Sequence, residues 1–243
     1  MKKLNIYDLV LEVGRFCDQE CEHCLRGERS KTKMSRQIIT KILEQIESID
    51  VLTFTGGEPF LYVNTIRFIL DELKRLDISV NRFFISTNGQ HLNTEILGLI
   101  FDLHCYSEEE YSSECFTMIR VSADQFHKDI DAKKLEFWKS LDFVNIDTHI
   151  EPRHLYQEGY AAEYYETCRF PSDQDLEFED NSVNGMVYIN ALGQVLLDCD
   201  YSYKSQHTKH VGSLKAESLY DILLRSANAN HACNLLETHN PAA

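Results

Sequence analysis

The sequence lacks the features that would place the protein in a membrane, in the secretory route or on a nucleic acid. Its 243 residues contain no run of eighteen apolar residues, which argues against a membrane-spanning helix. The polar residues after Met1-Lys2-Lys3 interrupt any signal-peptide core, so we expect a cytoplasmic protein with no membrane partner. Basic residues are also few: 24 against 39 acidic ones give a net charge of −15, which opposes a phosphate backbone and predicts no nucleic-acid partner.

Glycine and proline are scarce, with ten and four residues, and the chain has no low-complexity linker. With 43% hydrophobic and 26% charged residues, the composition is typical of an ordinary folded protein rather than a disordered one. At this length the chain can bury a large core, and α/β chains of this size are often one domain.

Cysteine is not scarce: the chain has eight. In a reducing compartment, cysteines serve as metal ligands or free thiols rather than disulfides. Three of them fall in the stretch Cys17-Asp18-Gln19-Glu20-Cys21-Glu22-His23-Cys24, and no fourth cysteine follows nearby. Thiolates at this spacing can converge on one soft metal centre, and an Fe–S cluster held by three cysteines keeps one iron open for another ligand. The alternative is a structural zinc site, which usually has four protein ligands.

Strand-like and helix-like segments alternate along the first 153 residues. Hydrophobic periodicity predicts strands at 5–13, 50–55, 79–86, 116–121 and 143–150, and helices at 36–48, 64–76, 93–103 and 132–141. This alternation implies a parallel sheet covered by helices, either a barrel or an open doubly wound sheet.

The pattern changes past residue 153, so we expect a core at 1–153 and a smaller part at 154–243. Residues 185–199 predict a β-hairpin with its turn near residues 190–194. A last helix is predicted at 217–226.

Short polar motifs stand at the ends of the predicted strands. They are Gly56-Gly57-Glu58-Pro59 after the second strand, Ser86-Thr87-Asn88 after the third and Ser122-Ala123-Asp124 after the fourth. In parallel α/β folds ligands bind at the carboxyl ends of the strands, so we expect a site there. The glycines let a ligand approach the backbone, and Glu58 can accept a hydrogen bond from an ammonium group. Arg153, after the fifth strand, can pair with a carboxylate of a cofactor or substrate, or form a surface ion pair.

In combination, Cys17-x3-Cys21-x2-Cys24 and Gly56-Gly57-Glu58-Pro59 resemble the radical S-adenosylmethionine (radical SAM) enzyme superfamily, over about residues 5–150. The resemblance implies an α/β fold built as a partial (β/α)6 TIM-like barrel, followed here by a small C-terminal β-hairpin plus helix extension. It also implies that Cys17, Cys21 and Cys24 bind a 4Fe–4S cluster. The amine and carboxylate of S-adenosylmethionine would chelate the open iron of that cluster.

The resemblance places the cofactor-binding residues at His23, Gly56, Gly57, Glu58, Pro59, Ser86, Asn88, Ser122 and Asp124. The motif at 56–59 would hold the methionyl amine, and the polar residues after the third and fourth strands would contact the methionyl carboxylate and ribose. His23 stands where the family usually has Phe or Tyr beside the adenine.

The chemistry implied by the resemblance is reductive cleavage of S-adenosylmethionine. The cluster passes an electron to the sulfonium, and the resulting 5′-deoxyadenosyl radical takes a hydrogen atom from the substrate. Such an enzyme needs a low-potential electron donor such as flavodoxin or ferredoxin.

Residues 154–243 resemble a short SPASM or twitch extension, found in family members that act on peptides and proteins. The resemblance predicts a peptide substrate, cross-linked or epimerised during ribosomal-peptide maturation. Cys168, Cys199 and Cys233 would then bind an auxiliary Fe–S cluster, unless the extension is free of a cluster. In a second interpretation, Cys199 or Cys233 is a thiol that donates a hydrogen atom.

Two alternatives stay open: the same chemistry on a small metabolite or nucleoside, and a non-catalytic iron–sulfur redox or sensor protein. A redox carrier would not need the motif at 56–59 with its rim of polar strand ends, which favours the enzyme. Cys105 and Cys115 are expected to be buried structural thiols.

Overall fold

The structure, a computed structural model, describes residues 2–107, 117–166, 170 and 175–238, with side chains as far as residue 229. Cys115 and Cys168 lie outside the described residues, and so does the side chain of Cys233.

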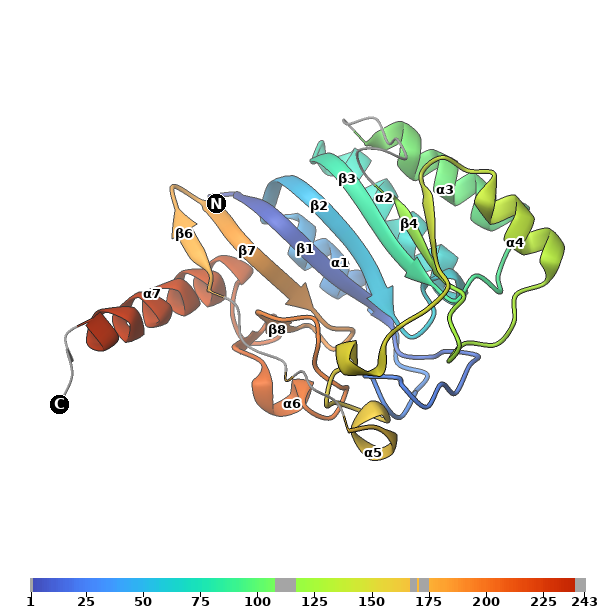
Figure 1. Cartoon of the computed structure of the whole chain (residues 1–243). Coiled ribbons are helices and arrows are strands. Elements are labelled where there is room, and N and C mark those ends of the chain that lie inside the picture. The colour runs from blue at the N-terminus through green and yellow to red at the C-terminus, as the bar shows by residue number, and fades with distance from the viewer. Residues whose placement is uncertain (1, 108–116, 167–169, 171–174, 239–243) are drawn as a thin grey trace.

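The described chain forms one sheet covered by helices (Figure 1). The strands are β1 (Leu4–Gly14), β2 (Ile46–Gly56), β3 (Ser79–Thr87), β4 (Ile119–Ser122), β5 (Val144–Asp147), β6 (Glu177–Glu179), β7 (Ser182–Ile189), β8 (Gln194–Leu196) and β9 (Gly212–Ser213). The α-helices are α1 (Arg36–Leu43), α2 (Val63–Leu76), α3 (Thr94–Tyr106), α4 (Ala132–Lys139), α5 (Ala161–Tyr164), α6 (Gln206–Lys209) and α7 (Leu219–Thr238). Two 3₁₀ turns, η1 (Pro59–Tyr62) and η2 (Pro152–His154), complete the elements.

The first five strands lie side by side in chain order and are parallel, which confirms the predicted α/β class. A further parallel strand, β7, pairs with β1 on its other side, with Leu9 opposite Val187. Strands β8 and β9 continue the sheet antiparallel, and the sheet does not close into a full barrel within the described residues. This arrangement is that of a partial barrel, with α1 to α4 on one side of the parallel strands (Figure 1).

Residues after 153 share the core of the preceding part. Val187 and Ile189 of β7 and Leu223 of α7 belong to the same buried cluster as Leu9 and Leu52. The predicted hairpin is present, with Asn190 N donating to Gln194 O at 3.0 Å. The later segment also supplies β7, a neighbour of the central strand β1. The predicted domain boundary at residue 153 stays a prediction.

The helix predicted at 36–48 is too long. It ends at Leu43, and β2 begins at Ile46, four residues before the predicted strand. The reason is tertiary: Leu4 at the start of β1 pairs with Ile46, and this parallel pairing outweighs the helical spacing of Ile42 and Ile46. The last helix errs in the other direction, because α7 continues to Thr238.

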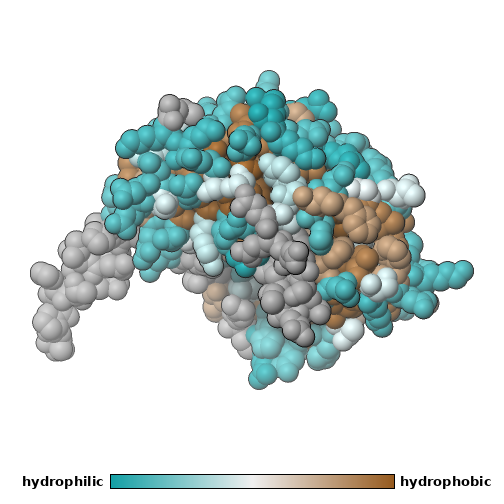
Figure 2. Space-filling view, turned by 90° about the horizontal axis from the view of Figure 1, so that it is seen from above, coloured by the Kyte–Doolittle hydropathy of each residue, from teal (hydrophilic) through white to brown (hydrophobic). Residues whose placement is uncertain are grey.

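The surface seen from above is mostly hydrophilic, with a hydrophobic area toward the end of the molecule where α3 lies (Figure 2). Phe101 of α3 is one of the exposed aromatic residues, at 48%. Among the described helices, none has the length and apolar character needed to cross a membrane.

Asp8, in the middle of β1, offers a test of the buried electrostatics. Its Oδ1 atom is buried and has no hydrogen-bond partner within the described part of the chain. Burial, with the nearby charge of Asp50, raises the pKa of Asp8 to about 6. The folded state therefore holds this proton more tightly than the unfolded state, and stability should fall as pH rises from about 4 to about 6. Asp8→Asn should remove this fall and raise the free energy of unfolding at pH 8 by up to about 3 kcal/mol.

Urea unfolding of both proteins at pH 5 and pH 8 measures this effect. Asp71→Asn, at an exposed carboxylate of α2, is the matched control and should leave the profile unchanged. An Asp8→Asn protein no more stable than the wild type at pH 8 would refute the assignment.

Candidate functional site

The loops that follow β1, β2, β3 and β4 line one cavity, at the carboxyl ends of the parallel strands. It has about 740 Å³ of space, part of it open to solvent. Most of the residues predicted from the sequence line it: Cys17, Cys21, His23, Cys24, Gly56, Gly57, Glu58, Ser86, Asn88 and Ser122. Pro59 and Asp124 lie buried behind this lining.

Arg153 is not brought to the cavity. The fifth strand ends at Asp147, earlier than predicted, so Arg153 falls in η2, where it is exposed and pairs with Glu151.

The three cysteines lie on the loop after β1 as half-buried free thiols. Cys24 N donates to Cys21 O at 3.0 Å, and Gln19 N donates to Cys17 Sγ at 3.4 Å. Burial, with the nearby charges of Glu58 and Asp18, raises the pKa of Cys17 to about 11. Burial, with the charges of Cys24 and Cys17, raises the pKa of Cys21 to about 12. Three cysteines that line one cavity offer three sulfur donors, the donor set that fits an iron–sulfur cluster, and the charge of the bound irons would stabilise their thiolate forms.

Gly56 and Gly57 let the loop after β2 pack directly on the cysteine loop. Gly57 N donates to Gly14 O at 2.9 Å, and Glu58 N donates to Phe16 O at 3.0 Å. A Cβ atom on Gly57 would lie 2.1 Å from Phe16 O, and Gly56 has a φ of +140°, which favours glycine. The glycines are therefore required by contact between two backbones.

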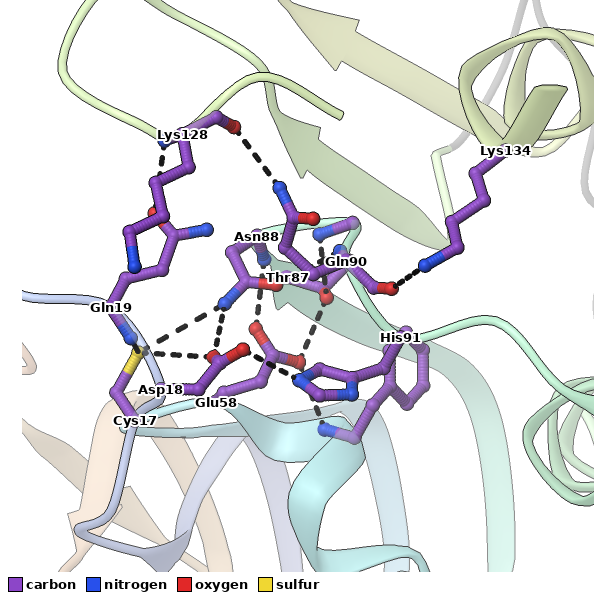
Figure 3. Close-up of polar contacts among 12 residues, drawn as sticks. Cys17, Asp18, Gln19, Glu58, Thr87, Asn88, Gln90, His91, Lys128 and Lys134 are labelled. Atoms are coloured by element: carbon purple, nitrogen blue, oxygen red, sulfur yellow. Dashed lines mark hydrogen bonds and ion pairs between the residues drawn. The ribbon is translucent and has the colours of Figure 1, made fainter. Parts of the chain in front are cut away.

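Glu58 ties the loop after β2 to the loop after β3 (Figure 3). Its buried carboxylate accepts hydrogen bonds from Phe60 N at 3.0 Å, Thr87 Oγ1 at 2.8 Å and Asn88 N at 2.8 Å. Burial raises the pKa of Glu58, while these donors act in the opposite direction. Both carboxylate oxygens are thus engaged by the protein, and a contact of residues 56–59 with a methionyl amine stays a prediction.

Asn88 extends this network to the cysteine loop, because its Nδ2 donates to Asp18 Oδ1 at 2.9 Å (Figure 3). Asp18 in turn contacts His91 Nε2 at 3.1 Å. The loops after β1, β2 and β3 are therefore one hydrogen-bonded unit.

His23 lies in an aromatic cluster after β4. Its ring stacks on Phe126 with centroids 4.6 Å apart and meets His127 edge-on at 4.8 Å. Asp124 does not face the cavity: its Oδ1 contacts His127 Nδ1 at 2.9 Å. Burial lowers the pKa of His23 to about 4, so its ring is neutral at pH 7. Neither Phe126 nor His127 was predicted as a site residue, and only their closeness to Asp124 in sequence pointed to them.

Four further residues of the cavity lining were not among the predicted site residues. Arg15, Arg26, Tyr160 and Tyr203 line the cavity, and the same four residues line a larger open groove. This groove runs along residues 157–163 and 202–208, and α5 and α6 lie beside the cysteine loop at this end of the molecule (Figure 1).

Two other described cysteines, Cys199 and Cys105, do not line this cavity. Cys199 is half-buried beside Asp200, and burial raises the pKa of its thiol to about 12. Cys105 is exposed near the end of α3, so the expectation of a buried thiol was wrong there, because the residue falls on the solvent face of the helix.

The profile of the Radical SAM superfamily matches residues 11–133, which is just over half of the chain. The chain belongs to the radical SAM superfamily. Membership implies a 4Fe–4S cluster and S-adenosylmethionine as cofactors, and it supports a radical enzyme over a non-catalytic sensor. Among the curated proteins, no sequence matches this radical SAM enzyme.

Several solved structures resemble the fold of this chain. The structure of histidine-tagged anSMEcpe with bound AdoMet has a TM-score of 0.60 at 13% identity, covering 93% of this chain and 82% of that one. Native anSMEcpe with bound AdoMet and Cp18Cys peptide gives 0.59 at 13%, covering 94% and 82%. SuiB of Streptococcus suis bound to its precursor peptide SuiA gives 0.47 at 13%, covering 91% and 64%. At these identities the likeness to the two anSMEcpe structures shows the fold alone.

Proposed function

We propose that this radical SAM enzyme removes a hydrogen atom from a peptide, during ribosomal-peptide maturation by cross-linking or epimerisation. The observation that carries the proposal is the open groove that shares a wall with the cysteine cavity. An extended chain fits an open groove, whereas a small metabolite or nucleoside is usually enclosed in a pocket. The bound peptide of the structurally similar anSMEcpe agrees with this proposal.

The cavity residues divide between two cofactors. Cys17, Cys21 and Cys24 would hold the 4Fe–4S cluster, and residues 56–59 with Ser86, Asn88 and Ser122 would face S-adenosylmethionine. When bound, these two groups together supply the radical chemistry that takes a hydrogen atom from the substrate.

The chain itself orients these groups and excludes water. Glu58 joins the loop after β2 to the loop after β3 by hydrogen bonds. Tyr62 Oη accepts a hydrogen bond from Phe16 N at 2.8 Å and so fixes the start of the cysteine loop. The neutral ring of His23 on Phe126 offers a flat, uncharged surface of the kind that an adenine base stacks on.

Residues 154–243 act as the substrate-facing extension in this proposal, of the SPASM or twitch type. Cys199, with Cys168 and Cys233, is a candidate ligand of an auxiliary Fe–S cluster. In the competing assignment the Cys199 or Cys233 thiol donates a hydrogen atom. The raised pKa of Cys199 supports the donor role, because a donor must keep its S–H bond at neutral pH.

The electron donor in this proposal is a low-potential protein such as flavodoxin or ferredoxin, and the location is the cytoplasm. The net charge of −15 is the observation that opposes a nucleic-acid substrate.

Anaerobic reconstitution tests the cofactor assignment. We expect about four irons per chain for one cluster, and about eight if the extension binds a second. With dithionite, the reconstituted protein should convert S-adenosylmethionine to 5′-deoxyadenosine, measured by chromatography. Adding the peptide encoded by a neighbouring reading frame should produce a mass change in that peptide. A zinc-only or metal-free protein would contradict the cluster, and an unmodified peptide would contradict the substrate.

A further inference from the structure

Arg26 is a buried cation without a carboxylate partner in the described part of the chain. Its exposed fraction is 9%, and its Nη1 donates to the carbonyl oxygen of Tyr201 at 2.7 Å. The guanidinium also lies over the ring of Tyr188, 5.2 Å from its centroid. A carbonyl oxygen and a ring face do not neutralise a full charge, and buried charges in proteins are usually paired.

The buried carboxylate whose charge acts on Arg26 is that of Glu12, and it is already used by other groups. Glu12 Oε1 accepts from Arg15 Nε at 2.6 Å and from Ala191 N at 3.0 Å. Its Oε2 accepts from Tyr188 Oη at 2.6 Å and from Gln206 Nε2 at 3.0 Å. Glu12 therefore neutralises Arg15, and the charge of Arg26 is left to a group from outside the described chain.

The position of Arg26 shows where such a group would lie. Arg26 lines both the cysteine cavity and the open groove, and it follows Cys24 by two residues. Tyr203 lines the same two spaces, and its backbone N donates to Arg26 O at 3.0 Å. Its buried hydroxyl has no hydrogen-bond partner among the residues that the structure describes. Two polar side chains with unused hydrogen-bonding capacity thus meet where the groove enters the cavity.

We propose that Arg26 binds a carboxylate of the substrate, so that the peptide presents an acidic residue at the junction of groove and cavity. A planar guanidinium matches a carboxylate with two parallel hydrogen bonds, which gives orientation as well as affinity. The proposal rests on the peptide substrate proposed above and adds to it the class of residue that is anchored beside the cysteine loop. Arg26, Tyr160 and Tyr203 line the groove as well as the cavity, whereas none of residues 56–59 lines the groove, which favours a substrate carboxylate over that of S-adenosylmethionine.

The test uses reconstituted enzyme with S-adenosylmethionine and two fluorescent, end-capped peptides, Gly-Gly-Glu-Gly-Gly and Gly-Gly-Gln-Gly-Gly, followed by fluorescence anisotropy. The wild type should bind the glutamate peptide at least about tenfold more tightly, and Arg26→Gln should bind both alike. Arg26→Lys keeps the charge without the planar fork and should retain only part of the preference, so it serves if Arg26→Gln does not fold. Arg67→Gln, at a more exposed arginine of α2 paired with Asp102, is the matched control and should keep the full preference.

A wild type that binds the two peptides equally overturns the proposal while dithionite-driven cleavage of S-adenosylmethionine stays intact. If Arg26→Gln weakens the binding of S-adenosylmethionine and leaves peptide preference unchanged, the carboxylate is that of the cofactor and the proposal is wrong. Failure of both peptides to bind overturns the peptide substrate and this inference with it.

Discussion

Replacing Cys21 by alanine is expected to abolish the formation of 5′-deoxyadenosine and to lower the iron content of the reconstituted protein by about four irons per chain. Cys21 is the middle member of three thiols that line one cavity, and burial together with the charges of Cys24 and Cys17 raises its pKa to about 12. A 4Fe–4S cluster held by two thiolates loses one of its protein ligands and is exposed to solvent at two irons. We expect no S-adenosylmethionine cleavage above background, measured with dithionite under anaerobic conditions.

Cys105→Ala is the matched control, because Cys105 is an exposed free thiol on α3 and does not line the cavity. This variant should retain the full iron content, the visible absorption of the cluster and the cleavage rate. If Cys21→Ala cleaves S-adenosylmethionine at the wild-type rate, the cysteine loop is not the cluster site.

The alternation of hydrophobic periods predicted the parallel sheet well, because that pattern is a direct consequence of burial. Ile66, Ile69 and Leu73 are buried on one face of α2, as their spacing predicts. The border between α1 and β2 was misplaced because the pairing of Leu4 with Ile46 joins strands that the local sequence does not connect. The parallel pairing of β7 with β1 was not predicted, since periodicity reports burial and not strand neighbours.

At the functional site too, local sequence predicted some residues, whereas those brought together by distant parts of the chain were not predicted. Residues next to strand ends, such as Ser86 and Ser122, could be placed in advance because parallel strands end at one edge of a sheet. Arg26 and Tyr203 could not, because they meet across 177 residues of chain and neither belongs to a motif. The motif predicted a ligand contact for Glu58, which stays a prediction, whereas its structural role as the acceptor of three hydrogen bonds from the protein could not be inferred from the sequence.

That role makes Glu58→Ala the second variant with a large expected effect. The substitution leaves Phe60 N, Asn88 N and the hydroxyl of Thr87 without their acceptor in a buried region, where Glu58 is 1% exposed. An unsatisfied buried donor costs about 1–3 kcal/mol, so we expect a loss of about 3–5 kcal/mol in the free energy of unfolding, measured with urea. Displacement of the loop after β3 by about 1 Å should reduce 5′-deoxyadenosine formation about a hundredfold.

Two further variants distinguish a structural role of Glu58 from a role in binding the amine of a ligand. Glu47→Ala removes an exposed glutamate from β2, the strand that precedes Glu58, and should change neither stability nor cleavage. Glu58→Gln keeps one carbonyl acceptor but turns an amide N–H toward a backbone or hydroxyl donor, so it should lose stability as well as activity. If Glu58 acted only on the bound cofactor, Glu58→Gln would unfold at the wild-type urea concentration and lose S-adenosylmethionine affinity alone. The three hydrogen bonds to the protein predict that stability and affinity fall together.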